Sequence, residues 1–280
     1  MELSGEGPGD GTVGKALDVL EMVAKMGRPV RFSELLAQSR YPKATLSRYV
    51  QTLTNQGMLV HDPDRHDYAL GVRLLRLAHV AWRQSSLAPL ARPFIDQLSV
   101  ETGETVHLAQ LDHGQVLYVD KCNAAKPVEM FSQAGKIGPA YCTGVGKAML
   151  AWLEPDALER IIAQQSFHRF TAQTLATPMA LIAELAATRA RGHALDREEH
   201  EPGIICVALP ILTRAGRVLG ALSVTSTTER STLDALSRFA PRVRATAEQI
   251  AELAESWRFP ETDSKDQRHK EANGGAKCPV

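Results

Sequence analysis

The fold of this chain is decided by residues 33–60, which read SELLAQSRYPKATLSRYVQTLTNQGMLV. Apolar residues recur at helical spacing on both sides of Pro42, and a proline cannot occupy a helix interior. The stretch therefore predicts two short helices joined by a tight turn, the first N-capped by the Ser33 hydroxyl and the second beginning at Lys43. The second helix is expected to bury three side chains at helical spacing, those of Leu46, Val50 and Leu53.

A β-hairpin is expected directly behind these helices. Residues 58–60 and 67–70 are short apolar runs, and the sequence between them, HDPDRH, is rich in turn residues. With a further helix expected over 13–26, the pattern predicts a winged helix-turn-helix domain over residues 12–70. The second helix of such a pair reads the major groove of double-stranded DNA. Residues 1–11 hold several glycines and no β-branched residue, so we expect them to be disordered.

The exposed face of the reading helix is expected to carry short polar side chains and one arginine. Between residues 28 and 56 five basic residues stand against a single acid, Glu34, and phosphate binding uses such a surplus because affinity comes from counterion release. The hairpin tip is placed to contact a phosphate or the minor groove. The expected DNA contacts are Ser33, Lys43, Ala44, Thr45, Ser47, Arg48, Gln51 and Arg65. A winged helix used for protein contacts is the alternative.

Composition limits the class of protein. The 280 residues include 32 basic and 32 acidic side chains, so the basic surplus is local, which favours a sequence-specific reader over a packaging protein. No apolar run is long enough to cross a membrane and the N-terminus does not resemble a signal peptide, so we expect a cytoplasmic protein. The four cysteines are scattered and predict neither a disulfide framework nor a zinc ribbon.

The remainder of the chain predicts a linker helix and a second domain. Residues 71–86 read as a helix whose apolar side chains nearly encircle it, and such a helix is expected to pack against more than one neighbour, including a second subunit. A domain over 87–258 and a loose tail over 259–280 follow. Strands are expected at 105–111, 115–121, 128–131, 193–197, 204–213 and 217–225, and helices at 87–103, 143–153, 155–164, 178–191 and 231–257, the last opening at Ser231 with Asp234 three residues on. Two groups of strands separated by helices predict an α+β domain with a mostly antiparallel sheet.

One patch in this domain is a glycine turn, YCTGVGKA at residues 141–148. It is neither a Walker A loop nor a dinucleotide fingerprint, since Ala148 follows the lysine and Met149 occupies the third glycine position. No cofactor is therefore expected. A glycine turn at a helix N-terminus favours a small anion such as a carboxylate, and the alternative is a plain helix entry with Thr143 as N-cap.

Two further patches carry polar residues in or beside apolar strands. The stretch 192–203 holds two histidines and several acids, which leaves open a metal-binding sensor or an enzyme that uses the cluster from His193 to Glu201. The strands around Cys206, Ser223 and Thr225 are otherwise apolar, and a buried hydroxyl needs a partner that a bound sugar or keto acid would supply. A nucleophilic cysteine paired with a histidine has no recognisable motif here, so we do not expect an enzyme.

Taken in order, the motifs PKATLSR at 42–48, TGVGKA at 143–148, GHALDREE at 192–199 and GIICVA at 203–208 resemble the IclR family of bacterial transcriptional regulators. The resemblance implies a GAF-like α/β effector-binding domain behind the winged helix-turn-helix, and a homodimer or homotetramer. It also implies a pocket for a small carboxylate effector. The positions that match the family's pocket are Gly144, Val145, Asp196, Cys206, Ser223 and Thr225.

Within the family, residues 121–123, 131–141 and 257–260 are similar to the branch that includes the 2-keto-3-deoxygluconate repressor. This similarity implies a sugar acid or a keto acid as effector. The sequence as a whole predicts an effector-responsive regulator, a repressor of a catabolic operon, whose partners are operator DNA, a small carboxylate and further copies of itself.

Overall fold

The computed structural model describes residues 11–124 and 130–255. The chain divides into two compact units between Ala81 and Trp82, a point that falls inside helix α4 (Val72–Ser85). The segments expected to be disordered lie outside the described residues except for Gly11, and so does the motif at 257–260. No helix in the described part of the chain is both long enough and apolar enough to span a membrane.

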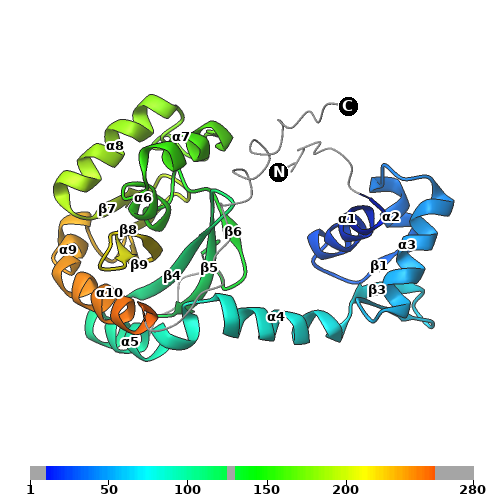
Figure 1. The fold of residues 1–280 in the computed structure, drawn as a ribbon. Coiled ribbons are helices and arrows are strands. Elements are labelled where there is room, and N and C mark those ends of the chain that lie inside the picture. The colour runs from blue at the N-terminus through cyan, green and yellow to red at the C-terminus, as the bar shows by residue number, and fades with distance from the viewer. Residues whose placement is uncertain (1–10, 125–129, 256–280) are drawn as a thin grey trace, which may run out of the picture. The chain divides into compact units, whose positions relative to one another are not determined.

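The first unit is a winged helix-turn-helix (Figure 1). Its elements are α1 (Thr12–Lys25), β1 (Val30–Arg31), α2 (Phe32–Gln38), α3 (Lys43–Asn55), β2 (Leu59–Asp62) and β3 (Asp67–Leu70). The hairpin expected behind the helix pair is β2–β3, and β1 joins its other edge to give an antiparallel sheet in the order β1-β3-β2. Helix α3 begins directly after Pro42, and it buries the predicted Leu46, Val50 and Leu53 together with Tyr49.

The expected N-cap of α2 was wrong. Arg31 occupies the N-cap position in an extended conformation because it is the last residue of strand β1 and pairs with Asp67. The Glu34 carboxylate reaches back and accepts the Arg31 N–H at 2.8 Å. Ser33 is therefore the second residue of the helix, where its side chain is exposed.

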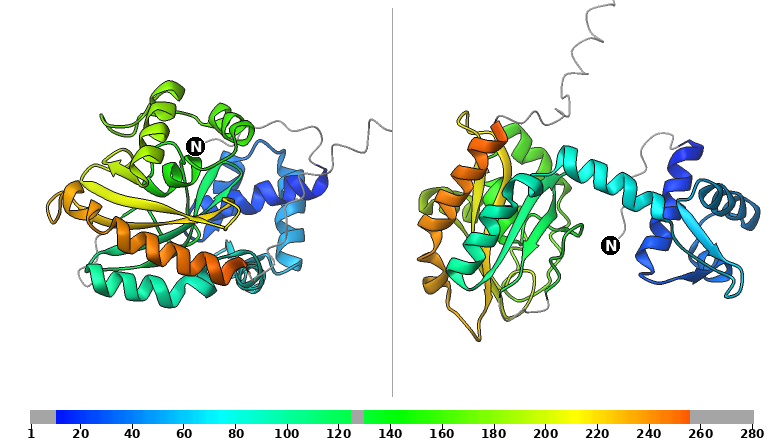
Figure 2. Two further views of the ribbon diagram at one scale, coloured as in Figure 1. Left: turned by 60° about the vertical axis from the view of Figure 1, so that its left-hand side comes forward. Right: turned by 90° about the horizontal axis from the view of Figure 1, so that it is seen from below.

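The second unit is a six-stranded antiparallel sheet covered by helices on both faces (Figures 1 and 2). Its strand order is β6-β5-β4-β9-β8-β7. The strands are β4 (Thr105–Asp112), β5 (Gln115–Cys122), β6 (Ile137–Gly138), β7 (Ala194–Arg197), β8 (Ile204–Leu212) and β9 (Val218–Thr227), and the helices are α5 (Ala88–Thr102), α6 (Gly144–Leu150), α7 (Pro155–Gln164), α8 (Pro178–Arg191), α9 (Leu233–Ser237) and α10 (Ala240–Glu255). The predicted α+β class with an antiparallel sheet is confirmed.

Each face of this sheet contributes to its own apolar core. Strand residues such as Val106, Leu108 and Val207 pack with α5 and α10, whereas Ala109, Cys206 and Ala208 pack with α6 and α8. This division follows from strand geometry, since successive side chains point to opposite faces. The second face carries the small and polar residues, and it leaves room for a cavity beneath α6.

Three predicted elements of this unit differ from the structure. Met130 and Phe131 are not in a strand, while 128–129 lie outside the described residues; β6 instead pairs with β5 at Ile137–Gly138. Helix α6 ends at Leu150 rather than at 153. The final helix is broken into α9 and α10, because Pro241 has no N–H to donate to a preceding turn.

The cap expected at Ser231 is also displaced. Thr232, one residue later, is the N-cap of α9, and its hydroxyl accepts the Ala235 N–H at 3.2 Å. Asp234 lies in the first turn of that helix, so the capping-box interpretation with Ser231 was wrong.

Candidate functional site

Helix α3 presents a continuous polar face to solvent. Lys43, Ala44, Ser47, Arg48 and Gln51 are exposed, Thr45 is half-buried, and the opposite face is the apolar one described above. Two of these side chains are held in place. The Gln51 amide donates to Asn55 Oδ1 at 2.8 Å, and the Arg48 guanidinium lies 5.4 Å from the centroid of the Tyr49 ring.

The basic surplus around this face is smaller than the sequence count suggested. Arg28 forms an ion pair with Glu34 at 2.5 Å, and Arg40 forms one with Asp18 at 2.6 Å. Asp18 belongs to α1, so this acid lies outside residues 28–56, in which Glu34 is the single acid. Arg31, Lys43 and Arg48 form no ion pair with the described residues. On the hairpin, Arg65 is 77% exposed and lies 3.9 Å from the Asp62 carboxylate.

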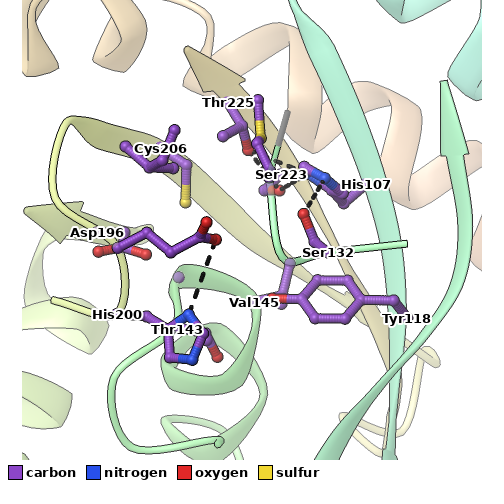
Figure 3. A pocket seen from close by; sticks show the side chains of 14 residues that line it. His107, Tyr118, Ser132, Thr143, Val145, Asp196, His200, Cys206, Ser223 and Thr225 are labelled. Carbon is purple, nitrogen blue, oxygen red and sulfur yellow. Dashed lines mark hydrogen bonds and ion pairs between the residues drawn. The ribbon is translucent and has the colours of Figure 1, made fainter. Parts of the chain in front are cut away.

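The second unit contains a cavity of about 380 Å³, measured to its open mouth, between α6 and the face of the sheet that bears small and polar residues (Figure 3). All six residues that match the family's pocket line it: Gly144, Val145, Asp196, Cys206, Ser223 and Thr225. They come from helix α6 and from three consecutive strands, β7, β8 and β9, which follow it later in the sequence.

Strand register explains why these side chains meet. Asp196 is paired with Cys206, which is paired with Thr225 on the next strand. A neighbouring row pairs Ala208 with Ser223, and Ser223 with His107. Residues paired directly across a sheet point to the same face, so the rows carry their polar side chains to one side.

Gly144 lets the first turn of α6 approach the sheet. A Cβ atom at this position would lie 2.2 Å from Cys206 Sγ, well inside van der Waals contact. Thr143 stands at the N-cap position, but its hydroxyl donates to Pro139 O at 2.8 Å and does not cap the helix. Thr143 is thus the N-cap residue that the alternative of a plain helix entry expected, but without the side-chain cap.

Asp196 is the pocket carboxyl with the most altered acidity. Burial and the nearby Glu199 carboxylate raise its pKa to about 7, even though its Oδ1 accepts the Glu199 N–H at 2.9 Å. Glu199 turns away from the cavity and forms a fully buried ion pair with Lys147 of α6. Burial still raises the pKa of Glu199, while Lys147 acts in the opposite direction.

Sequence reasoning missed a histidine in the pocket. His107 of β4 lies with Nε2 2.7 Å from Ser132 Oγ, and with Nδ1 3.2 Å from Thr225 Oγ1 and 3.3 Å from Ser223 Oγ (Figure 3). Ser223 and Thr225 also lie within 3.1 Å of each other. The protein itself therefore supplies hydrogen-bond partners for both hydroxyls, a role that the sequence analysis assigned to a bound ligand. The pattern Val106-His107-Leu108 offered a signal, since strand alternation turns the histidine away from the apolar face.

The cluster from His193 to Glu201 does not assemble into one site. Asp196, His200 and Glu201 line the pocket, whereas Glu199 contacts Lys147 and His193 is not among the lining residues. In residues 11–124 and 130–255 no group of three His, Cys, Asp or Glu side chains is placed to hold a metal ion. His200 faces Glu201 at 3.8 Å and not a cysteine, and burial raises the pKa of the Cys142 and Cys206 thiols. The geometry favours neither a metal centre nor a cysteine nucleophile.

Both units of the chain match known protein domains. Residues 12–63 match the IclR helix-turn-helix domain, and residues 79–252 match the model described as bacterial transcriptional regulator IclR C-terminal. The chain belongs to the IclR family. It is thus a DNA-binding transcriptional regulator, and its relatives are regulators rather than enzymes.

Relatives within the IclR family lie at about 30% identity. The regulator XynR of Escherichia coli K12 is 31% identical over 78% of this chain and 87% of its own length. KdgR of the same organism is 29% identical over 86% of this chain and 92% of its own length, which supports the KdgR-like branch. The crystal structure of the Thermotoga maritima IclR protein superposes with a TM-score of 0.70 at 26% identity, covering 86% of this chain and 98% of the other.

Proposed function

We propose that this IclR-family regulator represses a catabolic operon and that a small acid bound in the second unit changes its affinity for operator DNA. The observation that carries the proposal is the convergence of six residues from four separate elements on one cavity.

The lining chemistry supports a carboxylate as the ligand. No lysine or arginine is among the described residues that line the cavity, so backbone N–H, hydroxyl, carboxyl and imidazole groups are the donors that a carboxylate would meet. The N–H groups of Gly144 and Val145 lie in the first turn of α6, where a helix leaves its donors without intrahelical partners. With a pKa of about 7, Asp196 retains its proton in a large share of molecules at neutral pH and can donate an O–H to a carboxylate oxygen.

The resemblance to the KdgR-like branch favours a sugar acid or a keto acid over an aromatic acid. The abundance of hydroxyl and imidazole groups on the wall opposite Asp196 agrees with that choice, since these groups match hydroxyl and keto oxygens.

On DNA, we propose that α3 lies in the major groove with its exposed polar face toward the bases. The proposed contacts are Lys43, Ala44, Thr45, Ser47, Arg48 and Gln51 of the helix, Ser33 of α2 and Arg65 of the hairpin. Arg48 suits guanine, because a guanidinium can donate two hydrogen bonds to that base edge.

The exposed apolar residues of α4 support a homo-oligomer. Val72 and Leu75 are each 71% exposed, and large apolar side chains that recur along a helix are commonly covered by a partner. We propose that α4 packs against its copy in a dimer, and that two such dimers associate to form a tetramer.

A titration of the full-length chain tests the effector proposal. Sugar acids, keto acids and aromatic acids are added in turn, and binding to the DNA upstream of the regulator's own gene is followed by fluorescence anisotropy. We expect a sugar acid or keto acid to change the affinity about five- to hundredfold, the usual size of such coupling. The proposal is wrong if DNA binding is specific and none of the acids alters it.

A further inference from the structure

Four buried polar side chains form one hydrogen-bonded group on the pocket wall. The imidazole of His107 lies between Ser132 on its Nε2 side and the pair Ser223 and Thr225 on its Nδ1 side (Figure 3). All four side chains are at most 6% exposed, and all four line the cavity. We call them the His107 cluster.

The number of hydrogens in the His107 cluster is fixed. Complete burial lowers the pKa of His107 to about 3, so the ring is neutral and carries one N–H. The three hydroxyls contribute three more, which gives four hydrogens. Three links suffice to connect the four side chains, and each link uses one hydrogen: Ser132 to Nε2, Nδ1 to the serine–threonine pair, and Ser223 to Thr225. One hydroxyl hydrogen is therefore left over. Among the described residues these three hydroxyls donate to no further acceptor, so this hydrogen faces the cavity that the cluster lines.

The tautomer of His107 decides where that hydrogen lies. When Nε2 carries the ring proton it donates to Ser132, and the Ser132 O–H is free to point into the cavity. When Nδ1 carries the ring proton it donates to Ser223 or Thr225, Ser132 donates to Nε2, and one hydroxyl of the pair is free instead. Both arrangements satisfy the same three links, so the structure gives neither a large advantage.

Asp196 lies across the cavity from this cluster. It is on β7, and His107 is on β4, with β8 and β9 between them in the sheet. Three strand spacings amount to about 14 Å, which the side chains shorten from both sides. A ligand that meets Asp196 with its carboxylate therefore directs its other end toward the His107 cluster.

We propose that His107 is a positioning residue. By exchanging its tautomer, it directs one hydroxyl hydrogen into the cavity, either from Ser132 or from the Ser223–Thr225 pair. The pocket therefore selects small acids with an acceptor oxygen at the end remote from the carboxylate. Sugar acids and keto sugar acids have such an oxygen, because their chains carry hydroxyl groups up to the end remote from the carboxylate. An acid with a plain hydrocarbon chain leaves the hydrogen buried and unpaired, which costs binding free energy. This inference rests on the proposed effector function of the same cavity.

The test compares three acids of equal chain length with the full-length protein. Isothermal titration calorimetry measures the binding of D-gluconate, 2-keto-D-gluconate and hexanoate. We expect the first two to bind at least about tenfold more tightly than hexanoate. In His107→Asn a polar atom remains near the place of Nδ1, and in His107→Gln one remains near that of Nε2; neither variant links both ends of the cluster, so both should lose most of the preference. His113→Asn is the matched control, because that histidine is 96% exposed at a turn where its φ of 47° suits asparagine.

A spectroscopic measurement on the wild type does not depend on how the variants fold. The ring nitrogens of His107 are observed by NMR in the ¹⁵N-histidine-labelled chain and assigned by their loss in His107→Asn. We expect a neutral ring whose tautomer populations change when D-gluconate is added. An unchanged tautomer at saturating gluconate, or equal acid preference in wild type and both variants, overturns the inference.

The two proposals fail in different ways. If gluconate shifts the tautomer of His107 but leaves DNA binding unchanged, the positioning role stands and the effector function is wrong. If acids release DNA with the same preference in both His107 variants, the effector function stands and the positioning role is wrong. If none of the three acids binds the wild-type chain, the positioning role is wrong, and the effector function is decided by the DNA-binding titration with the wider set of acids.

Discussion

Lys147 and Glu199 form an ion pair in the interior of the second unit, with the Lys147 ammonium donating to Glu199 Oε1 and both side chains at most 3% exposed. Glu199 Oε2 has no hydrogen-bond partner in the described residues. The backbone N–H of Glu199 donates to Asp196 Oδ1 at 2.9 Å. The ion pair therefore joins two walls of the pocket, because Glu199 belongs to the loop that follows β7 and Lys147 belongs to helix α6.

Lys147→Met is expected to destabilise the protein by about 3–5 kcal/mol, because the substitution leaves the buried Glu199 carboxylate uncompensated. Urea unfolding of the second unit measures the change. The double variant Lys147→Met/Glu199→Gln removes the charge as well and should recover a substantial part of the loss. A single variant as stable as wild type would show that Glu199 is already protonated.

Asp196→Asn is expected to make stability less dependent on pH. The native carboxyl, with its pKa raised from 3.8 to about 7, keeps a proton that the unfolded chain has lost. The wild type therefore loses stability as the pH rises from about 4 to 7 and levels off above that. Thermal unfolding at pH 5 and pH 8 should show the variant gaining relative to wild type at the higher pH. An equal difference at both values contradicts the raised pKa.

Gly144→Ala is expected to destabilise the chain by about 1–3 kcal/mol and to abolish the response to an acid, because the new methyl group overlaps with Cys206 Sγ. Cys206→Ala in the same chain removes that sulfur; the next nearest atom, Ala208 Cβ, is at 3.4 Å, so stability should recover. Gly11→Ala is the control, with no atom within 4 Å of its added Cβ. Failure of the double variant to regain stability would place the strain elsewhere.

Arg48→Ala is expected to weaken operator binding by about 1–3 kcal/mol and to relax base preference, as for an arginine that reads a base edge. Arg28→Ala removes the same charge from a side chain that is paired with Glu34, and it should have a much smaller effect. Anisotropy titrations with specific and scrambled DNA measure both. Equal losses in the two variants would indicate that α3 contributes charge only.

Leu75→Glu is expected to weaken self-association, because it places a charge among the exposed apolar residues of α4. Analytical ultracentrifugation over a range of concentrations measures the effect. Met179→Glu on α8, where the side chain is 80% exposed, is a control for an added surface charge. A dimer that persists in Leu75→Glu assigns the interface to another surface.

The elements of the fold were predictable where local rules act alone. Pro42 sets the start of α3, and the period of the apolar residues identifies its buried face. The N-cap of α2 was not predictable from Ser33, because strand β1 draws Arg31 into an extended conformation by pairing with a residue 36 positions away. The same kind of remote pairing produces β6.

The pocket shows the same limit. Gly144 and Asp196 belong to recognisable motifs, so the family resemblance pointed to them, and the structure brings them together. His107 belongs to no motif, and its relation to Ser223 depends on the register between β4 and β9. Register is set by the packing of the complete sheet, and no stretch of the sequence contains it.

The ion pairs of Arg28 and Arg40 have a consequence for how the regulator searches the genome. Each guanidinium is already neutralised by a carboxylate of its own domain, so neither releases a counterion in full when the domain meets a phosphate. If the three cations around α3 that form no ion pair, Arg31, Lys43 and Arg48, each meet a phosphate, the logarithm of the DNA affinity should fall with the logarithm of salt with a slope near −3 for each domain. Nonspecific DNA would then hold the protein only briefly, and its residence at a site would depend on the base contacts of α3.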